Sequence, residues 1–134
     1  MKLGNKLLVF ICIMFSGWQI SLHASESANP QSSKRCVPLA QIDGITIIDD
    51  KNIVFRTPGN KQFLNRLPHS CPNLDKRKAI MYKTPLNQLC NMDIITVLDP
   101  VGGGFISMGA CGLGDFQPIS EAEFKDLKES MKDK

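Results

Sequence analysis

The sequence predicts a small, mostly β domain in which an antiparallel meander of about six strands closes into a barrel-like or sandwich-like arrangement, with two disulfides and one C-terminal helix. Short β-branched runs separated by Gly, Pro, Asn and Asp recur from position 45 onward. An even number of cysteines follows an export signal, which indicates a disulfide framework. An amphipathic segment with a capping box ends the chain. The cysteines concerned are Cys36, Cys71, Cys90 and Cys111.

Residues 1–24 have the features of a signal peptide. Lys2 and Lys6 supply the positive start, an apolar stretch follows, and small or apolar residues precede a cleavage site between Ala24 and Ser25. The apolar stretch is shorter than the roughly 20 residues of a membrane span, so no stable membrane anchor is expected after cleavage. The alternative is an uncleaved N-terminal anchor. The sequence therefore predicts a periplasmic or secreted protein.

Cleavage leaves about 110 residues, enough for one domain. Residues 25–35 are almost devoid of apolar side chains and predict a disordered leader. The β domain is then expected over 36–119 and the helix over 120–134. Loss of the two signal lysines lowers the net charge from +3 to +1. This near-neutral charge excludes an electrostatic basis for nucleic-acid binding.

The first half of the domain predicts three strands joined by short turns. These strands cover residues 45–48, 53–57 and 62–67. Period-2 alternation places Ile53, Phe55 and Thr57 on one face, with Val54 and Arg56 on the other. Short connections predict an antiparallel meander.

The second half is predicted from shorter signals. Residues 37–42 are expected to form a short turn or a single helical turn, 86–90 one helical turn, and 79–83 a fourth strand. Residues 93–98 are apolar on both faces, which predicts a central strand that Asp99 and Pro100 end. Residues 101–104 are expected to be a flexible connector to a strand at 105–111, followed by an extended piece to Ile119.

The C-terminal segment predicts an amphipathic helix. Ser120 is the expected N-cap and Glu123 stands three residues later, at the capping-box spacing. Phe124, Leu127 and Met131 form one apolar stripe, which is expected to dock on the domain.

The four cysteines are expected to form disulfides rather than a metal site. No C-x-x-C pair occurs, which argues against zinc and against a redox dithiol. Three connectivities are open, and the one we favour joins Cys71 to Cys90 and Cys36 to Cys111. No metal and no cofactor are expected.

Catalytic motifs are weak. His69 lies near Cys71, but a Cys–His nucleophile needs a free thiolate, so a surface histidine is favoured. The glycines of residues 109–114 lack the Lys-Ser/Thr ending of a phosphate loop and predict a bend instead. No catalytic residue is assigned, and the sequence favours a non-enzymatic protein.

One candidate binding site remains open. Arg56, Asn65, Arg66 and Tyr82 lie on predicted strands and are the residues from which a small anionic site of a ligand binder or hydrolase would be built. The interpretation we favour is that the arginines are exposed and pair with acids such as Asp49, Asp50 or Asp93.

Several short pieces resemble a family of small exported proteins of Gram-negative bacteria whose function is unknown. The pieces are Cys36-Val37-Pro38-Leu39 with Ile42-Asp43, Asn65-Arg66-Leu67, Cys71-Pro72-Asn73-Leu74, Leu89-Cys90 with Asp93-Ile94-Ile95, and Cys111-Gly112-Leu113-Gly114 with Phe116. The resemblance implies a periplasmic or secreted location and assigns no site residue. The function expected is an exported, non-enzymatic module that binds an unknown protein or envelope component.

Overall fold

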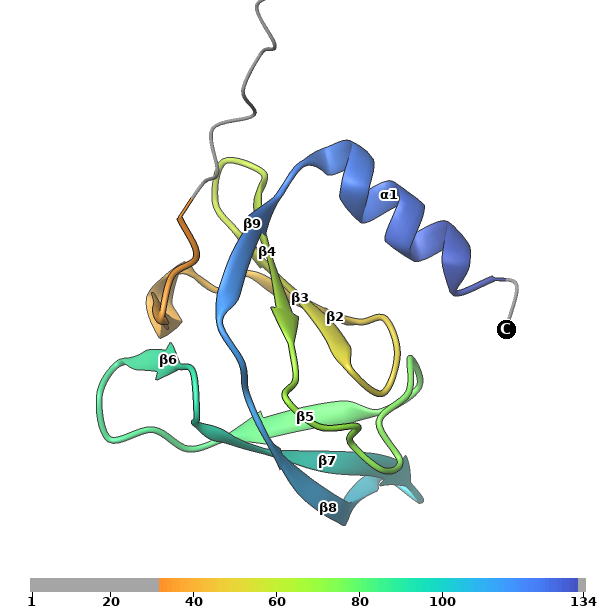
Figure 1. The fold of residues 1–134 in the computed structure, drawn as a ribbon. Coiled ribbons are helices and arrows are strands. Elements are labelled where there is room, and N and C mark those ends of the chain that lie inside the picture. The colour runs from red at the N-terminus through yellow and green to blue at the C-terminus, as the bar shows by residue number, and fades with distance from the viewer. Residues whose placement is uncertain (1–31, 133–134) are drawn as a thin grey trace, which may run out of the picture.

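The computed structural model describes residues 32–132. It contains nine strands, a short 3-10 segment and one α-helix (Figure 1). The elements are β1 (Cys36–Pro38), η1 (Leu39–Gln41), β2 (Gly44–Ile47), β3 (Asn52–Thr57), β4 (Lys61–Arg66), β5 (Ala79–Tyr82), β6 (Gln88–Cys90), β7 (Ile94–Val101), β8 (Gly104–Gly112), β9 (Phe116–Ile119) and α1 (Glu121–Ser130). The predicted signal peptide and the first part of the predicted leader lie outside the described residues.

The strands form three antiparallel sheets, which confirms the mostly β prediction. The meander β2-β3-β4 is extended by β9 into a four-stranded sheet. A second sheet has the order β5-β7-β8, and β1 pairs with β6. In Figure 1 the four-stranded sheet runs down the page and the three-stranded sheet runs across below it. Within the described residues the sheets stay separate, so the arrangement is sandwich-like and not a closed barrel.

The main core lies between the two larger sheets. Ile53 and Phe55 of β3 point into it, as the alternation predicted, and both are fully buried. Phe55 meets Phe116 edge to face, with ring centroids 5.3 Å apart. Ile95 and Val97 of β7 close the core from the three-stranded sheet. Because side chains alternate along a strand, each sheet commits one face to this core.

Helix α1 covers the other face of the four-stranded sheet. The capping box is present, since Ser120 and Glu123 each accept a hydrogen bond from the other's backbone N–H. The predicted stripe docks on a second apolar cluster, which confirms that prediction. Its members are Ile48, Val54, Leu64, Ile119, Phe124, Leu127 and Met131.

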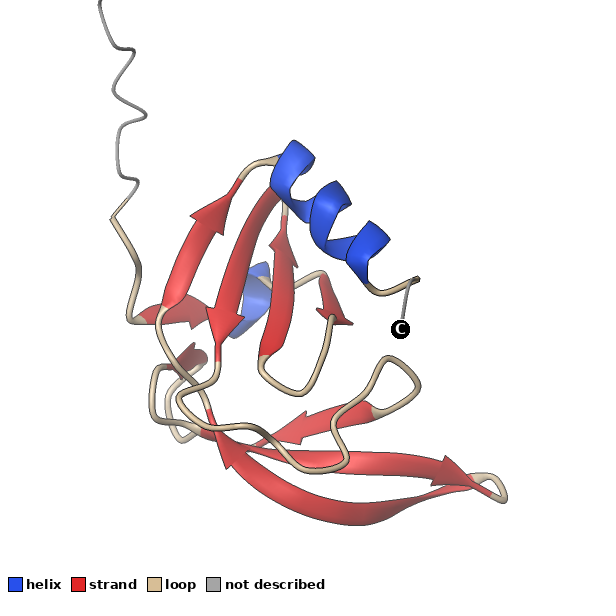
Figure 2. Ribbon diagram, turned by 45° about the vertical axis from the view of Figure 1, so that its right-hand side comes forward, coloured by secondary structure: helices blue, strands red, loops and turns tan. Residues whose placement is uncertain are grey.

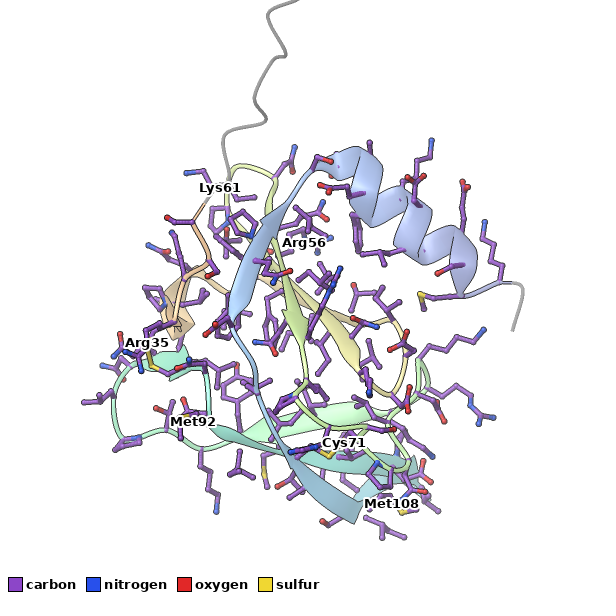
Figure 3. All side chains as sticks on the ribbon, in the orientation of Figure 1. Arg35, Arg56, Lys61, Cys71, Met92 and Met108 are labelled. Carbon is purple, nitrogen blue, oxygen red and sulfur yellow. A yellow bond between two sulfur atoms is a disulfide. The ribbon has the colours of Figure 1, made fainter. Side chains whose placement is uncertain are left out.

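The disulfide pairing that the sequence favoured is wrong. Cys36 is bonded to Cys90, and Cys71 is bonded to Cys111. The first bridge joins directly opposed residues of β1 and β6, a strand pair that the sequence did not predict. The second joins the loop after β4 to the end of β8, where Figure 3 shows Cys71 above the β7–β8 hairpin. The first bridge therefore joins two strands, and the second joins a loop to a strand of the other sheet.

Three local expectations are also corrected. Residues 88–90 form strand β6 and not a helical turn. Strand β7 continues through Pro100, because β5 ends opposite Leu98 and leaves that stretch with a strand neighbour only on the β8 side. The expected flexible connector is a tight hairpin turn: Gly102 and Gly103 have φ of 59° and 82°, which a two-residue turn of this kind requires.

Candidate functional site

The outer face of the three-stranded sheet is uncharged. Ile95 and Val97 point into the core, so the alternate residues of β7 and their register partners point away from it. We call this set the open face. It consists of Ala79, Met81, Ile94, Thr96, Leu98, Pro100, Phe105, Ser107 and Ala110.

Large apolar side chains of the open face are exposed to solvent. Ile94 is 56% exposed and Phe105 is 65% exposed. Within residues 32–132, no element packs on this face, and Figure 2 shows the β7–β8 hairpin at the bottom reaching past the rest of the domain. Apolar side chains exposed together on one sheet face are typical of sites where another molecule binds.

Strand β8 adds an open edge to this surface. It is the longest strand, with nine residues, and it contains no charged residue and no proline. It pairs with β7 on one side only. Its one irregularity is a bulge opposite Val97 and Leu98 that leaves Met108 without a partner in the register. The side chain of Asn73 donates to the Met108 carbonyl at 3.1 Å, so the part of this edge that is open to a further strand lies before the bulge.

Arg56, from the sequence-predicted site, is exposed on the helix-facing side of β3 (Figure 3). Its Nε lies 3.2 Å from Oδ1 of Asp43, a residue that the sequence reading did not name as its partner. Both side chains are about half exposed, so the ion pair lies at the surface. Its guanidinium also lies over Gly44, where an added Cβ would approach Nη2 to 2.7 Å.

Asn65 is fully buried on the opposite, core-facing side of β4. Its Nδ2 donates to the carbonyl of Gly114 at 2.7 Å, and its Oδ1 accepts from the Gly114 N–H at 2.9 Å. Both ends of the amide are thus occupied by backbone. Asn65 fastens the segment before β9 to β4, and it offers no free polar atom to a ligand in this arrangement.

Arg66 and Tyr82 complete the sequence-predicted set. Arg66 is opposite Asn52, four residues along β3 from Arg56, so the two arginines are about 13 Å apart along the strand direction and lie on neighbouring strands. Tyr82 lies in the other sheet and packs against the main core. Arg56 and Arg66 share the helix-facing side but lie far apart along it, and Asn65 and Tyr82 lie on the core side, so the four side chains do not converge.

The groove beside the N-terminus of α1 holds one unusual polar group. Gln62 is 4% exposed, and its Nε2 donates to Oε2 of Glu121 at 2.5 Å. Its Oε1 is buried and has no hydrogen-bond partner among the described residues. Lys34, Lys61 and Glu123 line the same groove. A buried acceptor without a donor is costly, so this groove is a second candidate site.

The described residues give little support to a Cys–His nucleophile or to a metal site. Cys71 is oxidised in a disulfide, so it is no nucleophile for the exposed His69. Within residues 32–132, no cluster of three His, Cys, Asp or Glu side chains is arranged to hold a metal ion. No helix in that range is long and apolar enough to cross a membrane.

The open face was not predicted from the sequence, although the central position of the strand at 93–98 was, and β7 is the middle strand of its sheet. One signal was available. Between Asp93 and Asp115 the only charged residue is Asp99, and its carboxylate pairs with Lys78 at 2.8 Å. So long an uncharged stretch needs either burial or a partner, and only one face of β7 is buried.

The comparisons with known proteins place the chain in a family without assigning it an activity. A family of unknown function, DUF6491, matches residues 1–134. The chain belongs to this family. No curated protein and no solved structure matches it. Any functional argument therefore starts from the surface that the fold exposes.

Proposed function

We propose that this protein is an exported, disulfide-stabilised, non-enzymatic module that binds a protein partner through the open face and the β8 edge. The single observation behind this is that Phe105 and Ile94, large apolar side chains, stay exposed on an uncharged sheet face beside an unpaired strand. Strand edges bind extended partners through main-chain hydrogen bonds, and the adjoining face adds apolar area. The two structural disulfides support an oxidising compartment, periplasmic or extracellular.

Site-specific photo-crosslinking tests the binding surface directly. A photoreactive phenylalanine analogue replaces Phe105 in the exported protein, and a matched variant carries it at Lys125 on the exposed side of α1. The expected result is a discrete adduct from position 105 and none from position 125. No adduct at 105, or equal adducts at both positions, would contradict the proposed surface.

The location and oxidation state are tested by intact mass. Cleavage before Ser25 gives a defined mass for the exported chain. Two disulfides leave no thiol to alkylate before reduction and four alkylated cysteines after it. A retained signal segment, or a thiol that reacts without reductant, would overturn the export and disulfide parts of the proposal.

The groove at Gln62 supports a second candidate function, a small-ligand binder. The unpaired Oε1 of Gln62 calls for a donor N–H, and Glu121 and Glu123 make the surroundings favourable to an amine or amide group. Gln62→Met removes the acceptor while keeping the side-chain size. If the groove only has a structural role, the variant keeps wild-type stability, because the lost Glu121 hydrogen bond offsets the relieved acceptor. A clear gain in stability would show a polar group retained at a cost, as expected for a ligand site.

A further inference from the structure

The end of the β7–β8 hairpin differs from the rest of its sheet, because β5 does not extend along it. The pairing of β5 with β7 stops at Leu98, so residues 99–106 form a segment of only two strands, closed by the turn at Gly102 and Gly103. We call this segment the ribbon. Among the described residues no further strand pairs with either of its edges. The ribbon extends beyond the rest of the domain at the lower right of Figure 2.

Apolar side chains are exposed on both faces of the ribbon. Phe105 lies on the open face and is 65% exposed. Val101 and Ile106 lie on the opposite face, which faces the core further along β7, and here they are 51% and 54% exposed. The sequence from Pro100 to Gly114 contains no charged residue. A flat protein surface covers one face of such a ribbon, whereas lipid surrounds an inserted segment on every side.

We propose that the ribbon inserts shallowly into a phospholipid surface and attaches the exported protein to it reversibly. This inference goes beyond the protein partner proposed for the open face, with which the ribbon shares only Pro100 and Phe105. Exposed apolar side chains bind a lipid surface by burying apolar area at the boundary between the headgroups and the acyl chains.

The length of the ribbon matches the depth of that boundary. From Asp99, the one charged residue of the ribbon, to the turn at Gly102 is three residues, which is about 10 Å at roughly 3.3 Å per residue. Interfacial segments bury their apolar side chains roughly 5–10 Å deep. Deeper insertion is unfavourable, because hydrocarbon does not satisfy the backbone N–H and C=O groups along the two edges. The ribbon is therefore expected to be a shallow anchor.

The charges at the base of the ribbon suit a layer of lipid headgroups. The Asp99 carboxylate lies 2.8 Å from Nζ of Lys78, which offsets its charge. Lys76 and Arg77 precede Lys78 in the same loop and are exposed. Together with Asp75 these groups are three basic and two acidic side chains, so the net charge is +1. One positive charge near an anionic lipid surface strengthens binding about fivefold, so anionic lipids should help while apolar contacts dominate.

Vesicle co-sedimentation tests the attachment. The probe is unilamellar vesicles of phosphatidylethanolamine and phosphatidylglycerol, and the oxidised, signal-cleaved protein is expected to bind them. Ile106→Ser should weaken this partitioning about fivefold or more, because the exposed half of the isoleucine no longer contributes apolar area. Ile94→Ser is the matched control, since Ile94 is 56% exposed at the other end of β7, and it should bind like the wild type. Ile106 is not part of the open face, so its replacement leaves that surface intact.

Tryptophan fluorescence reports whether the ribbon enters the lipid. The only tryptophan of the chain is Trp18, in the predicted signal peptide, so the cleaved protein has no background emission. Phe105→Trp is expected to emit at shorter wavelength when vesicles are added and to be quenched by brominated acyl chains. Ile94→Trp is the control and should show neither change. Circular dichroism and thermal melting confirm that the variants are folded.

Three results would overturn the lipid assignment. One is a wild-type protein that does not bind the vesicles. Another is an equal loss of binding in the Ile106→Ser and Ile94→Ser variants, which would indicate adsorption of the whole sheet. The third is a Phe105→Trp emission that shifts with protein concentration in the absence of lipid, which would show that a second copy covers the ribbon.

The vesicle and crosslinking experiments separate this inference from the proposed function. If the protein does not bind vesicles but the photoreactive group at position 105 captures a protein, the proposed function stands and the lipid inference fails. If vesicles bind as expected but position 105 captures no protein, the lipid inference stands and the proposed function fails.

Discussion

The two larger sheets both carry apolar residues on their outer faces, but only one of those faces is covered. Val54 and Leu64 of the four-stranded sheet are buried because α1 lays Phe124 and Leu127 across them. On the three-stranded sheet, Phe105 remains exposed. An apolar outer face is thus no sign of an interaction by itself. An apolar outer face indicates an interaction site only where no other element of the described chain packs on it.

Besides the shared core, a disulfide and a side-chain amide tie the two larger sheets together. The Cys71–Cys111 bridge connects the loop after β4 to β8, and the Asn65 amide connects β4 to the segment between β8 and β9. Breaking each tie shows whether the three-stranded sheet keeps its structure when it is less firmly joined to the four-stranded sheet. The expected effects below run from the largest to the smallest.

Removing the inter-sheet bridge should have the largest effect. For a bridge with a sequence separation of 40, loss of the constraint on the unfolded chain costs about 4 kcal/mol, and Cys71→Ala with Cys111→Ala also leaves a gap where Cys71 is fully buried. The measurement is urea unfolding. That cost is a large part of the ~5–15 kcal/mol by which a domain is usually stable.

The other bridge is the control. Cys36–Cys90 has a sequence separation of 54, so the chain-entropy contribution is nearly the same, but both of its residues are only half-buried in the small β1–β6 sheet. Cys36→Ala with Cys90→Ala should therefore cost less. A larger loss from this pair would show that the two main sheets do not depend on the Cys71 bridge.

Cutting the second tie should have the next largest effect. Asn65→Ala leaves both the N–H and the C=O of Gly114 without their partner, and an unsatisfied buried group costs ~1–3 kcal/mol. We expect a loss of about 3 kcal/mol in the unfolding free energy. Exposed Arg66, the next residue, is the control, and Arg66→Ala should change stability little. If Asn65→Ala leaves stability unchanged, the amide serves something other than this tie.

The outcome at Asn65 shows which features of the fold can be predicted from the sequence and which cannot. Strand periodicity correctly assigned Ile53, Phe55 and Arg56 to their faces, because a period of two needs only local information. The same reasoning gave Ser120 and Glu123 their capping roles. It placed Asn65 in a binding site because the partner of its amide, Gly114, lies 49 residues away.

The disulfide pairing and the open face escaped prediction for a similar reason. Cys36 and Cys90 are directly opposed only because β1 pairs with β6, and each of those strands has three residues. Such short segments carry too little periodicity to reveal a strand. The run 93–98 showed its apolar composition, but composition does not tell whether a second face is buried or exposed.

Loosening α1 would expose the outer face of the four-stranded sheet, which tests the comparison between the two outer faces. Phe124 is half-buried against Val54 and Leu64, so Phe124→Ala should cost about 2 kcal/mol, below the ~3–5 kcal/mol of a fully buried phenylalanine. The variant should also bind a hydrophobic dye more strongly as α1 loosens. Ala122→Ser, on the exposed side of the same helix, is the control. No change in stability would mean that α1 is not needed as a cover.

The cap of α1 gives a smaller, pH-dependent effect. The backbone N–H of Ser120, and then its hydroxyl, donate to the Glu123 carboxylate and lower the pKa of Glu123 from its ordinary 4.5. Because the folded pKa is depressed, the stabilisation is present above pH 4.5 and is lost as the pH falls through the folded pKa. Thermal melting of Glu123→Gln should therefore approach the wild type at low pH. A difference that grows on acidification would contradict this sign.

Ser120→Ala is the companion variant at the same cap. It removes the side chain that accepts from the Glu123 N–H and should cost about 1 kcal/mol. Above pH 4.5, both cap variants should loosen α1 without altering the three-stranded sheet. Hydrogen exchange localised to residues 121–130 would verify that the effect stays on the covered face.

The smallest effect on stability is expected on the open face, where it is also the most informative. Phe105→Ser removes a ring that is 65% exposed, so little burial is lost and the unfolding free energy should change by less than about 0.5 kcal/mol. The matched change on the covered face is Phe124→Ala. If another molecule covers Phe105 in solution, the stability cost of Phe105→Ser should grow with the concentration of that molecule, because association stabilises the folded state by mass action. A concentration-independent cost as large as that of Phe124→Ala would mean that the open face is packed within a single chain, and the contrast between the two sheets would disappear.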